Sequence, residues 1–232
     1  MNTLDTAQIK ETAWEKLGGK WTNACLGFLL FIFISTIIDM PSIFFEDESV
    51  GQALYQSIWG PIVWVFTWIL DLGLFAFYYD IISNKTLSYK RLFFGFSKGF
   101  IYAVNVFCAQ LLMCIFIVLW SLLLIIPGIM KAFSYSMTLY ILIDHPEYSP
   151  LEAIKKSKEL MYGHRMELCI LELRFIPWLL FGIITLGIGF IWIVPYFMAA
   201  YSEFYLQLKE KSEPNTVEAI EVEATEVEAT EV

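Results

Sequence analysis

The sequence predicts an all-α, polytopic membrane protein. Of its 232 residues, 58% are hydrophobic and only 17% are charged, whereas a soluble domain typically carries about 25% charged residues. The apolar residues also form long blocks, and a helix needs about 20 apolar residues to cross the hydrocarbon core of a bilayer. The low charge and the long blocks together predict about six transmembrane helices.

The chain divides into three expected parts. Residues 1–20 form an amphipathic N-terminal segment, residues 21–210 a six-span membrane bundle, and residues 211–232 a disordered acidic tail. The tail repeats a five-residue motif and contains glutamates without aromatic residues. A period of five matches neither a helix nor a strand, and such a composition cannot form a packed core.

The N-terminal segment is expected to contain a short helix over residues 4–17. Ile9, Ala13, Leu17 and Trp21 recur at every fourth position, which places them on one face of a helix. That apolar face is expected to lie either in the membrane interface or against the bundle.

Glycine and proline mark two of the connections between the expected spans. Pro127 and Gly128 end the third block, and the sequence LGIG at 186–189 separates the fifth from the sixth. The fourth block is short for a full crossing, and the second is long enough to be tilted or broken near Gly73. The six expected spans cover residues 21–38, 57–82, 100–126, 129–143, 166–186 and 188–208.

The basic residues predict the orientation of the bundle, because Lys and Arg concentrate in short cytoplasmic loops. The first connection, residues 39–56, has acidic residues and no Lys or Arg. With six spans, all of the 15 Lys and Arg residues except Lys131 and Arg174 fall on one side. We therefore expect a multi-pass protein of the cell (plasma) membrane with both termini in the cytoplasm. Lys131 is expected at the opposite interface.

A capped cytoplasmic helix is expected just before the fifth span. Ser149 and Glu152 have the spacing of a capping box, and Pro150 suits a first helical turn. Basic residues on and after this helix are candidate contacts for anionic lipids or for a partner protein. Alternatively, they only fix the topology. These residues are Lys155, Lys156, Lys158 and Arg165.

Four charged residues within the apolar blocks form a candidate intramembrane polar cluster: Asp71, Glu172, Arg174 and Glu203. Charges inside a membrane are costly, so each suggests a function by default. Glu172 and Arg174 are two positions apart and point to nearly opposite faces of a helix. We therefore expect Arg174 to pair with Asp71 or Glu203. The pair would either hold the bundle in register or line a polar pathway.

No catalytic residue, metal site or cofactor is predicted. The sequence has no P-loop, no G-x-S-x-G, no H-E-x-x-H and no dinucleotide fingerprint. The basic residues are dispersed as topology markers and do not predict nucleic-acid binding. Tryptophans within the blocks are expected to pack in the bundle or anchor it at the interface, not to form a ligand cage. These are Trp64, Trp68, Trp120, Trp178 and Trp192.

Three motifs resemble a known family. They are the proline-glycine turn and capped helix in LLIIPGIMKAFSYSMTLYILIDHPEYSPLEAIKKSKELMYGHR, the segment LGIGFIWIVPYFMAAYSEFY, and LFFGFSKGF at 92–100. Together they resemble the bacterial integral membrane family labelled domain of unknown function 975, from the N-terminal helix to about Tyr205. The resemblance implies a multi-span protein of the cytoplasmic membrane. A more distant similarity, to the membrane domain of some glycerophosphodiester phosphodiesterases, implies no catalytic residue.

These observations favour a non-enzymatic membrane protein that acts through membrane lipids or a membrane protein partner, as an accessory, assembly or envelope-associated factor. The alternative is a small transporter or channel that uses the buried charges near Asp71 and Arg174, because charged and broken helices often line substrate sites. An intramembrane enzyme, which would depend on carboxylates alone, is the third hypothesis.

Overall fold

A computed structural model describes residues 4–40, 53, 55–85 and 87–212. The described part of the chain is helical and contains no strand, so the all-α class is confirmed. Of the predicted tail, only residues 211 and 212 are described, and they end the last helix. The α-helices are α1 (Thr6–Leu17), α2 (Trp21–Asp39), α4 (Gly60–Ile82), α5 (Phe94–Ser97), α6 (Phe100–Leu123), α7 (Ile125–Tyr135), α8 (Thr138–Asp144), α9 (Pro150–Leu160), α10 (Arg165–Leu173), α11 (Ile176–Ile184) and α12 (Phe190–Ser212).

Among the described residues, four helical stretches are long and apolar enough to cross a membrane. They match the first four predicted blocks, with the fourth starting earlier than expected. Large apolar side chains such as Phe33 and Leu122 are exposed on them, and exposed apolar surface of this extent marks contact with a membrane or a partner. Length and surface therefore indicate a membrane protein. The four stretches are Trp21–Asp39, Ser57–Ile82, Phe100–Leu123 and Ile125–Asp144.

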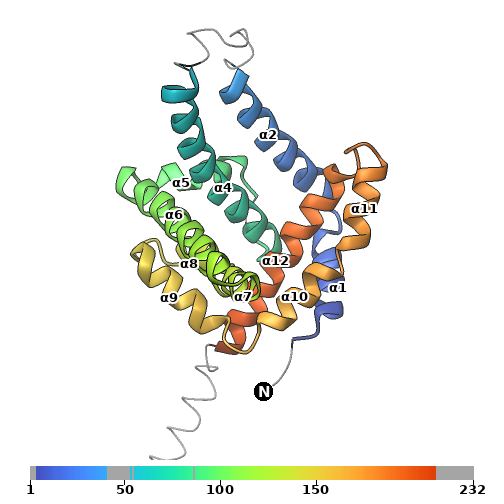
Figure 1. Ribbon diagram of the computed structural model, residues 1–232. Helices are drawn as coiled ribbons and strands as arrows, with labels where there is room; N and C mark the ends of the chain where they lie inside the picture. The colour runs from blue at the N-terminus through green and yellow to red at the C-terminus, as the bar shows by residue number, and fades with distance from the viewer. Residues whose placement is uncertain (1–3, 41–52, 54, 86, 213–232) are drawn as a thin grey trace, which may run out of the picture.

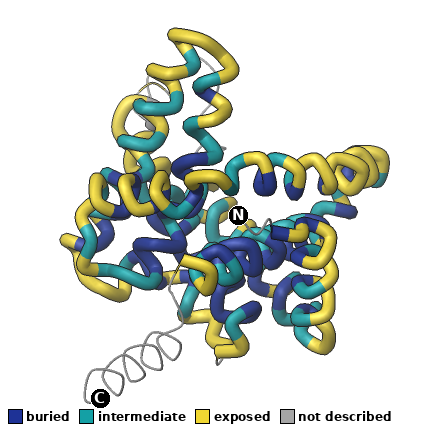
Figure 2. The backbone as a smooth tube through the Cα atoms, turned by 90° about the horizontal axis from the view of Figure 1, so that it is seen from below, coloured by how far each residue is buried: buried dark blue, intermediate teal, exposed yellow. Residues whose placement is uncertain are grey.

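Helix α4 forms the centre of the fold, and Figure 1 shows it between α2, α6 and α12. Almost every residue from Ile69 to Ile82 is buried, on all sides of the helix. A helix that is apolar all round lies either in a protein core or in a membrane, and neighbouring elements cover this half of α4. In Figure 2 the buried residues accordingly gather in the middle of the molecule, and exposed residues occupy the projecting parts.

Of the two alternatives for the second span, tilted or broken near Gly73, the break is wrong, because α4 continues through that residue. Gly73 instead lets the 3-10 helix η3 (Tyr89–Phe93) approach the α4 backbone closely. A Cβ atom at Gly73 would lie 1.7 Å from the carbonyl oxygen of Leu92. The glycine therefore serves a contact between two backbones.

Helices α6 and α7 form an antiparallel hairpin whose turn lies earlier than the sequence predicted. The chain reverses at Leu124, which is extended, and Pro127 falls inside the first turn of α7. Proline is tolerated there because the amide groups of a first turn have no partner within the helix. At Gly128 a Cβ atom would lie 2.1 Å from the Ser121 hydroxyl oxygen, so the glycine allows the two helices to meet.

The predicted fifth span is divided into two short helices, so a continuous helix over 166–186 is wrong. Helix α10 ends at Leu173, and α11 starts at Ile176. The cause is Pro177, which lacks the amide proton that would bond to the Leu173 carbonyl and whose ring would clash with it. Each half has nine residues, too few to cross a bilayer alone.

The N-terminal helix α1 packs against α12, α10 and α4, which agrees with the second of its two expected positions. Ile9, Ala13 and Leu17 are fully buried along one face. Asp5 caps the helix, since its carboxylate accepts hydrogen bonds from the amides of Ala7 and Gln8. The apolar stripe therefore joins α1 to the core.

Candidate functional site: an aromatic cavity

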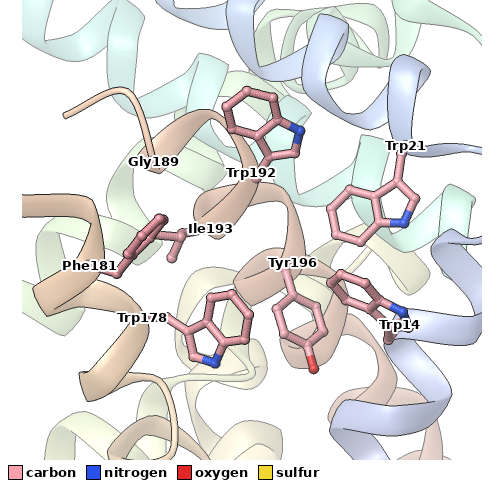
Figure 3. A pocket seen from close by; sticks show the side chains of 8 residues that line it. All are labelled: Trp14, Trp21, Trp178, Phe181, Gly189, Trp192, Ile193 and Tyr196. Atoms are coloured by element: carbon pink, nitrogen blue, oxygen red, sulfur yellow. The ribbon is translucent and has the colours of Figure 1, made fainter. Parts of the chain in front are cut away.

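Four tryptophans surround a cavity of about 410 Å³ between α1, α2, α11 and α12. Figure 3 shows Trp14 and Trp21 on one side of a common space and Trp178 on the other, with Trp192 and Tyr196 from α12 between them. Phe181, Gly189 and Ile193 complete the lining.

The positions of these rings follow from two turns in the chain. Trp14 and Trp21 lie on either side of the glycine turn that joins α1 to α2, and their ring centroids are 4.7 Å apart. The Trp14 ring packs edge-on to Tyr196 at 5.3 Å. Across the cavity, Trp178 lies 6.1 Å from the same tyrosine. Tyr196 thus connects the two walls.

The glycine-rich turn between α11 and α12 holds the second wall in place. Gly187 has φ of +92°, a left-handed conformation that favours glycine. A Cβ atom at Gly189 would lie 3.1 Å from the Cα atom of Gly182. The turn lies where the LGIG sequence predicted a connection, and the two helices approach each other closely there.

One cationic residue, Lys10, adjoins the cavity near Tyr196, and its side chain contacts the backbone of a second, Arg174. The Lys10 ammonium group lies 4.6 Å from the centroid of the Phe175 ring and 5.7 Å from that of Tyr196. It donates a hydrogen bond to the backbone carbonyl of Arg174 at 3.2 Å. Tyr196 in turn donates its hydroxyl proton to the Lys10 carbonyl at 3.1 Å. Lys10 is thereby fixed to the cavity wall.

The environment of Lys10 disfavours its positive charge. Burial lowers the pKa of Lys10 below the usual 10.5, and the neighbouring charge of Arg174 lowers this pKa further. Arg174 itself is exposed. An anion beside these two residues would stabilise both charges.

The predicted polar cluster does not assemble. All four of its members are described, and no ion pair joins any two of them. Glu203 is buried and pairs with Lys16 at 2.6 Å, while Glu172 accepts a hydrogen bond from the Tyr201 hydroxyl. The expected pairing of Arg174 with Asp71 or Glu203 is therefore wrong. The short α10 ends at Leu173 and leaves the Arg174 side chain exposed.

Asp71 lines two further cavities. One, of about 400 Å³, lies between α2 and α4 and also contains Ser35, Asp39 and Thr67. The other, of about 410 Å³, extends from α4 to α6, α7 and α8 and includes Gln110. The Asp71 carboxylate, within the second candidate span, thus lies in the lining of both cavities.

The capped helix α9 has the predicted capping box. The Ser149 amide donates to the Glu152 carboxylate at 2.8 Å, and the Glu152 amide donates to the Ser149 hydroxyl at 3.4 Å. The helix packs against α6, α7 and α8. The candidate contacts Lys155, Lys156 and Lys158 are exposed, whereas Arg165, at the start of α10, is partly buried.

Lys131 lies on the same part of the molecule as these basic residues. The charges of Lys158 and Arg165 act on it electrostatically, and its ammonium group lies 4.6 Å from the Trp120 ring. Helix α7 folds back from its turn and packs against both α9 and α10, which brings these charges near one another. The position of Lys131 at the opposite membrane interface stays a prediction.

The aromatic cavity is the feature that sequence reasoning missed. The four-residue spacing of Trp192 and Tyr196 is a helical period that could have indicated an aromatic face on one helix. Trp14 and Trp21 lie on different helices, so no helical period relates them, and no pattern indicates that their rings meet those of α12. No group of three or more His, Cys, Asp or Glu that could hold a metal occurs in the described ranges.

Residues 122–212 match the model of a family described as a protein of unknown function, DUF975, so this part of the chain carries a domain of that family. The matched part contains Trp178, Trp192 and Tyr196 of the cavity, whereas Trp14 and Trp21 precede it. The resemblance at 92–100 and in the N-terminal helix also lies outside it. No curated protein and no solved structure matches the chain. The family description assigns no activity.

Proposed function

We propose that this protein is a non-enzymatic membrane protein that holds the apolar chain of a membrane lipid in its four-tryptophan cavity. The observation that carries the proposal is an aromatic, almost wholly apolar hollow that adjoins the candidate span α2. Its volume of about 410 Å³ falls within the range of roughly 300–1,000 Å³ for ligand pockets.

The proposal includes the predicted orientation, a cell-membrane protein of six crossings with both termini in the cytoplasm. The arrangement of the ends supports it: the start of α1 and the end of α12 lie in the lower half of Figure 1, and the facing ends of α2 and α4 lie at the top. In this orientation α10 and α11 together make the fifth crossing and α12 makes the sixth. The lipid would then mediate an accessory or assembly role in the envelope, alone or with a membrane protein partner.

Fluorescence quenching by lipids with brominated acyl chains tests the proposal, because bromine quenches tryptophan at contact. The protein in detergent is titrated with such a lipid in two reciprocal variants. One variant keeps only the four cavity tryptophans and has phenylalanine at the other four positions, Trp59, Trp64, Trp68 and Trp120. The other keeps those four and has phenylalanine at Trp14, Trp21, Trp178 and Trp192.

The first variant should show quenching that saturates at a low ratio of lipid to detergent. The second should show weak quenching that rises in proportion to the lipid, as expected from random contact. Equal, unsaturated quenching in both variants would show that the cavity binds no chain.

A second candidate function is transport of a proton or small cation through the cavities at Asp71. This candidate is favoured because the Asp71 carboxylate lines two cavities that are bounded by different helices. Arg174 lines neither hollow, so this candidate rests on Asp71 alone. Liposomes that contain the protein and a pH-sensitive dye should leak protons faster than empty liposomes, and Asp71→Asn should abolish the difference without lowering the unfolding temperature. Leak at the rate of empty liposomes would eliminate it.

A further inference from the structure

We infer that the lipid is anionic and that Lys10 and Arg174 bind its phosphate headgroup while the chain occupies the tryptophan cavity. This inference rests on the proposed function and specifies its ligand. It assigns to Lys10, which no sequence pattern singled out, a role in selecting the lipid. It also gives Arg174 a partner outside the chain in place of the carboxylate that the sequence led us to expect.

The position of Lys10 links the cavity to the headgroup site. Its ammonium group lies over the Phe175 ring, and its backbone carbonyl accepts the Tyr196 hydroxyl proton. Tyr196 lines the cavity, and Phe175 packs against Tyr196 at 5.1 Å. A chain that enters beside Tyr196 therefore places its headgroup within reach of Lys10.

The positive charges of Lys10 and Arg174 have no acidic ion-pair partner within the described residues. No carboxylate forms an ion pair with Lys10 or Arg174, although both side chains are described. The nearest acidic residue in sequence on α10, Glu172, is engaged by the Tyr201 hydroxyl, and Glu203 by Lys16. The positive charges of Lys10 and Arg174 thus repel each other, and a phosphate group would form charge-assisted hydrogen bonds with both.

The free energies of binding within a membrane also favour recognition of the lipid through its headgroup. An acyl chain that moves from the bilayer into the cavity leaves one apolar environment for another, so burial gives little net free energy. Arg and Lys, by contrast, form strong charge-assisted hydrogen bonds with phosphate, and arginine does so in a bidentate geometry. The cations therefore add the headgroup-dependent part of the affinity to the smaller part that the apolar walls supply.

The test compares phosphatidylglycerol with phosphatidylcholine, both with the same brominated chains, in the variant that keeps only the cavity tryptophans. We expect about tenfold tighter saturating quenching by the anionic lipid, from two cations near an anionic group. The double change Lys10→Gln and Arg174→Gln should remove this preference, because it weakens the binding of phosphatidylglycerol more than that of phosphatidylcholine, whose choline cation offsets its phosphate charge. Lys10→Arg with Arg174→Lys, which keeps both charges, should retain it.

The matched control is Lys155→Gln with Lys156→Gln, which removes two exposed charges on α9 instead. This control should retain the preference for the anionic lipid. If the preference were lost in this control alone, lipid selection would belong to α9 and the inference would be overturned.

Saturating quenching of equal strength by both lipids would also overturn the inference while leaving the proposed function intact. The absence of saturation with either lipid would refute the proposed function itself. Should the double glutamine variant not fold, the preference of the Lys10→Gln single variant decides the matter.

Discussion

The ammonium group of Lys16 lies 2.6 Å from the carboxylate of Glu203, which joins the N-terminal helix α1 to the last helix α12. Glu203 is only 3% exposed, and it also accepts a hydrogen bond from Gln207. A buried carboxylate needs such partners because its desolvation is costly. The pair therefore makes α1 an integral part of the bundle.

Replacing Lys16 by methionine should destabilise the protein strongly, since it leaves Glu203 buried without its cation. Breaking a buried pair from one side typically costs about 3–5 kcal/mol, and we expect about 3 kcal/mol because part of the lysine side chain is exposed to solvent. The double change Lys16→Met with Glu203→Met should cost less than the single change. Unfolding curves in mixed micelles measure both, and a double variant less stable than Lys16→Met would argue against this role of the pair.

Gly73 should tolerate no larger residue, because the Leu92 backbone lies where its Cβ atom would be. Gly73→Ala must push η3 away from α4, and we expect a loss of at least about 3 kcal/mol, the upper part of the range for overpacking. Gly27→Ala is the comparison, because there the Cβ atom meets only the Phe77 ring, at 2.2 Å. A side chain can rotate more readily than a backbone can shift, so Gly27→Ala should cost less. The midpoint of thermal unfolding ranks the two variants, and equal midpoints would contradict the distinction.

Local signals predicted those parts of the fold that local energetics determine. The capping box of Ser149 and Glu152 predicted the start of α9, and the fourfold spacing of Ile9, Ala13 and Leu17 predicted the buried face of α1. In both cases the residues that carry the signal also make the stabilising contact. Pro177 was also a local signal for the interruption before Ile176, because proline disfavours a continuous helix. The signal is not decisive, since α12 continues through Pro195, and the apolar surroundings suggested a single span.

The candidate site could not be predicted, because it depends on which helices meet. Lys10 lies beside Phe175 and Tyr196, which come from the other end of the chain, and no periodicity within one helix encodes such a contact. The same holds outside the site for Lys16, which lies 187 positions from its partner Glu203. A sequence pattern assigns a residue to a face of its own helix but not to the neighbour that covers the face.

Removing the cap of α9 should loosen that helix without unfolding the bundle. Ser149→Ala loses the hydroxyl that accepts the Glu152 amide proton, and the loss of an N-cap typically costs about 1 kcal/mol. Hydrogen exchange of the amides in α9 should accelerate, while exchange in α4 stays unchanged. Glu159→Ala is the control, because it removes only the exposed ion pair with Lys156, and it should have little effect on exchange. Unchanged exchange in Ser149→Ala would show that tertiary packing alone fixes α9.

The preference for an anionic lipid should weaken as the pH rises, because Lys10 loses its proton. Burial and the charge of Arg174 lower the pKa of Lys10, so the group becomes neutral at a lower pH than an ordinary lysine. Only the protonated form attracts a phosphate, and the preference is therefore complete below this pKa and falls as the pH passes through it. Quenching titrations with the two brominated lipids between about pH 7 and about pH 10 follow the change.

Lys10→Arg separates this titration from other effects of alkaline pH. Arginine stays protonated over the whole range, so the variant should keep its preference where the natural protein loses it. Lys10→Gln should show a weaker preference, due to Arg174 alone, that does not change with pH. A parallel decline in all three proteins would mean that another group titrates, and a constant preference in the natural protein would mean that Lys10 does not contact the headgroup. Because binding and protonation are linked, an anionic lipid should also raise the pKa of Lys10 once it is bound.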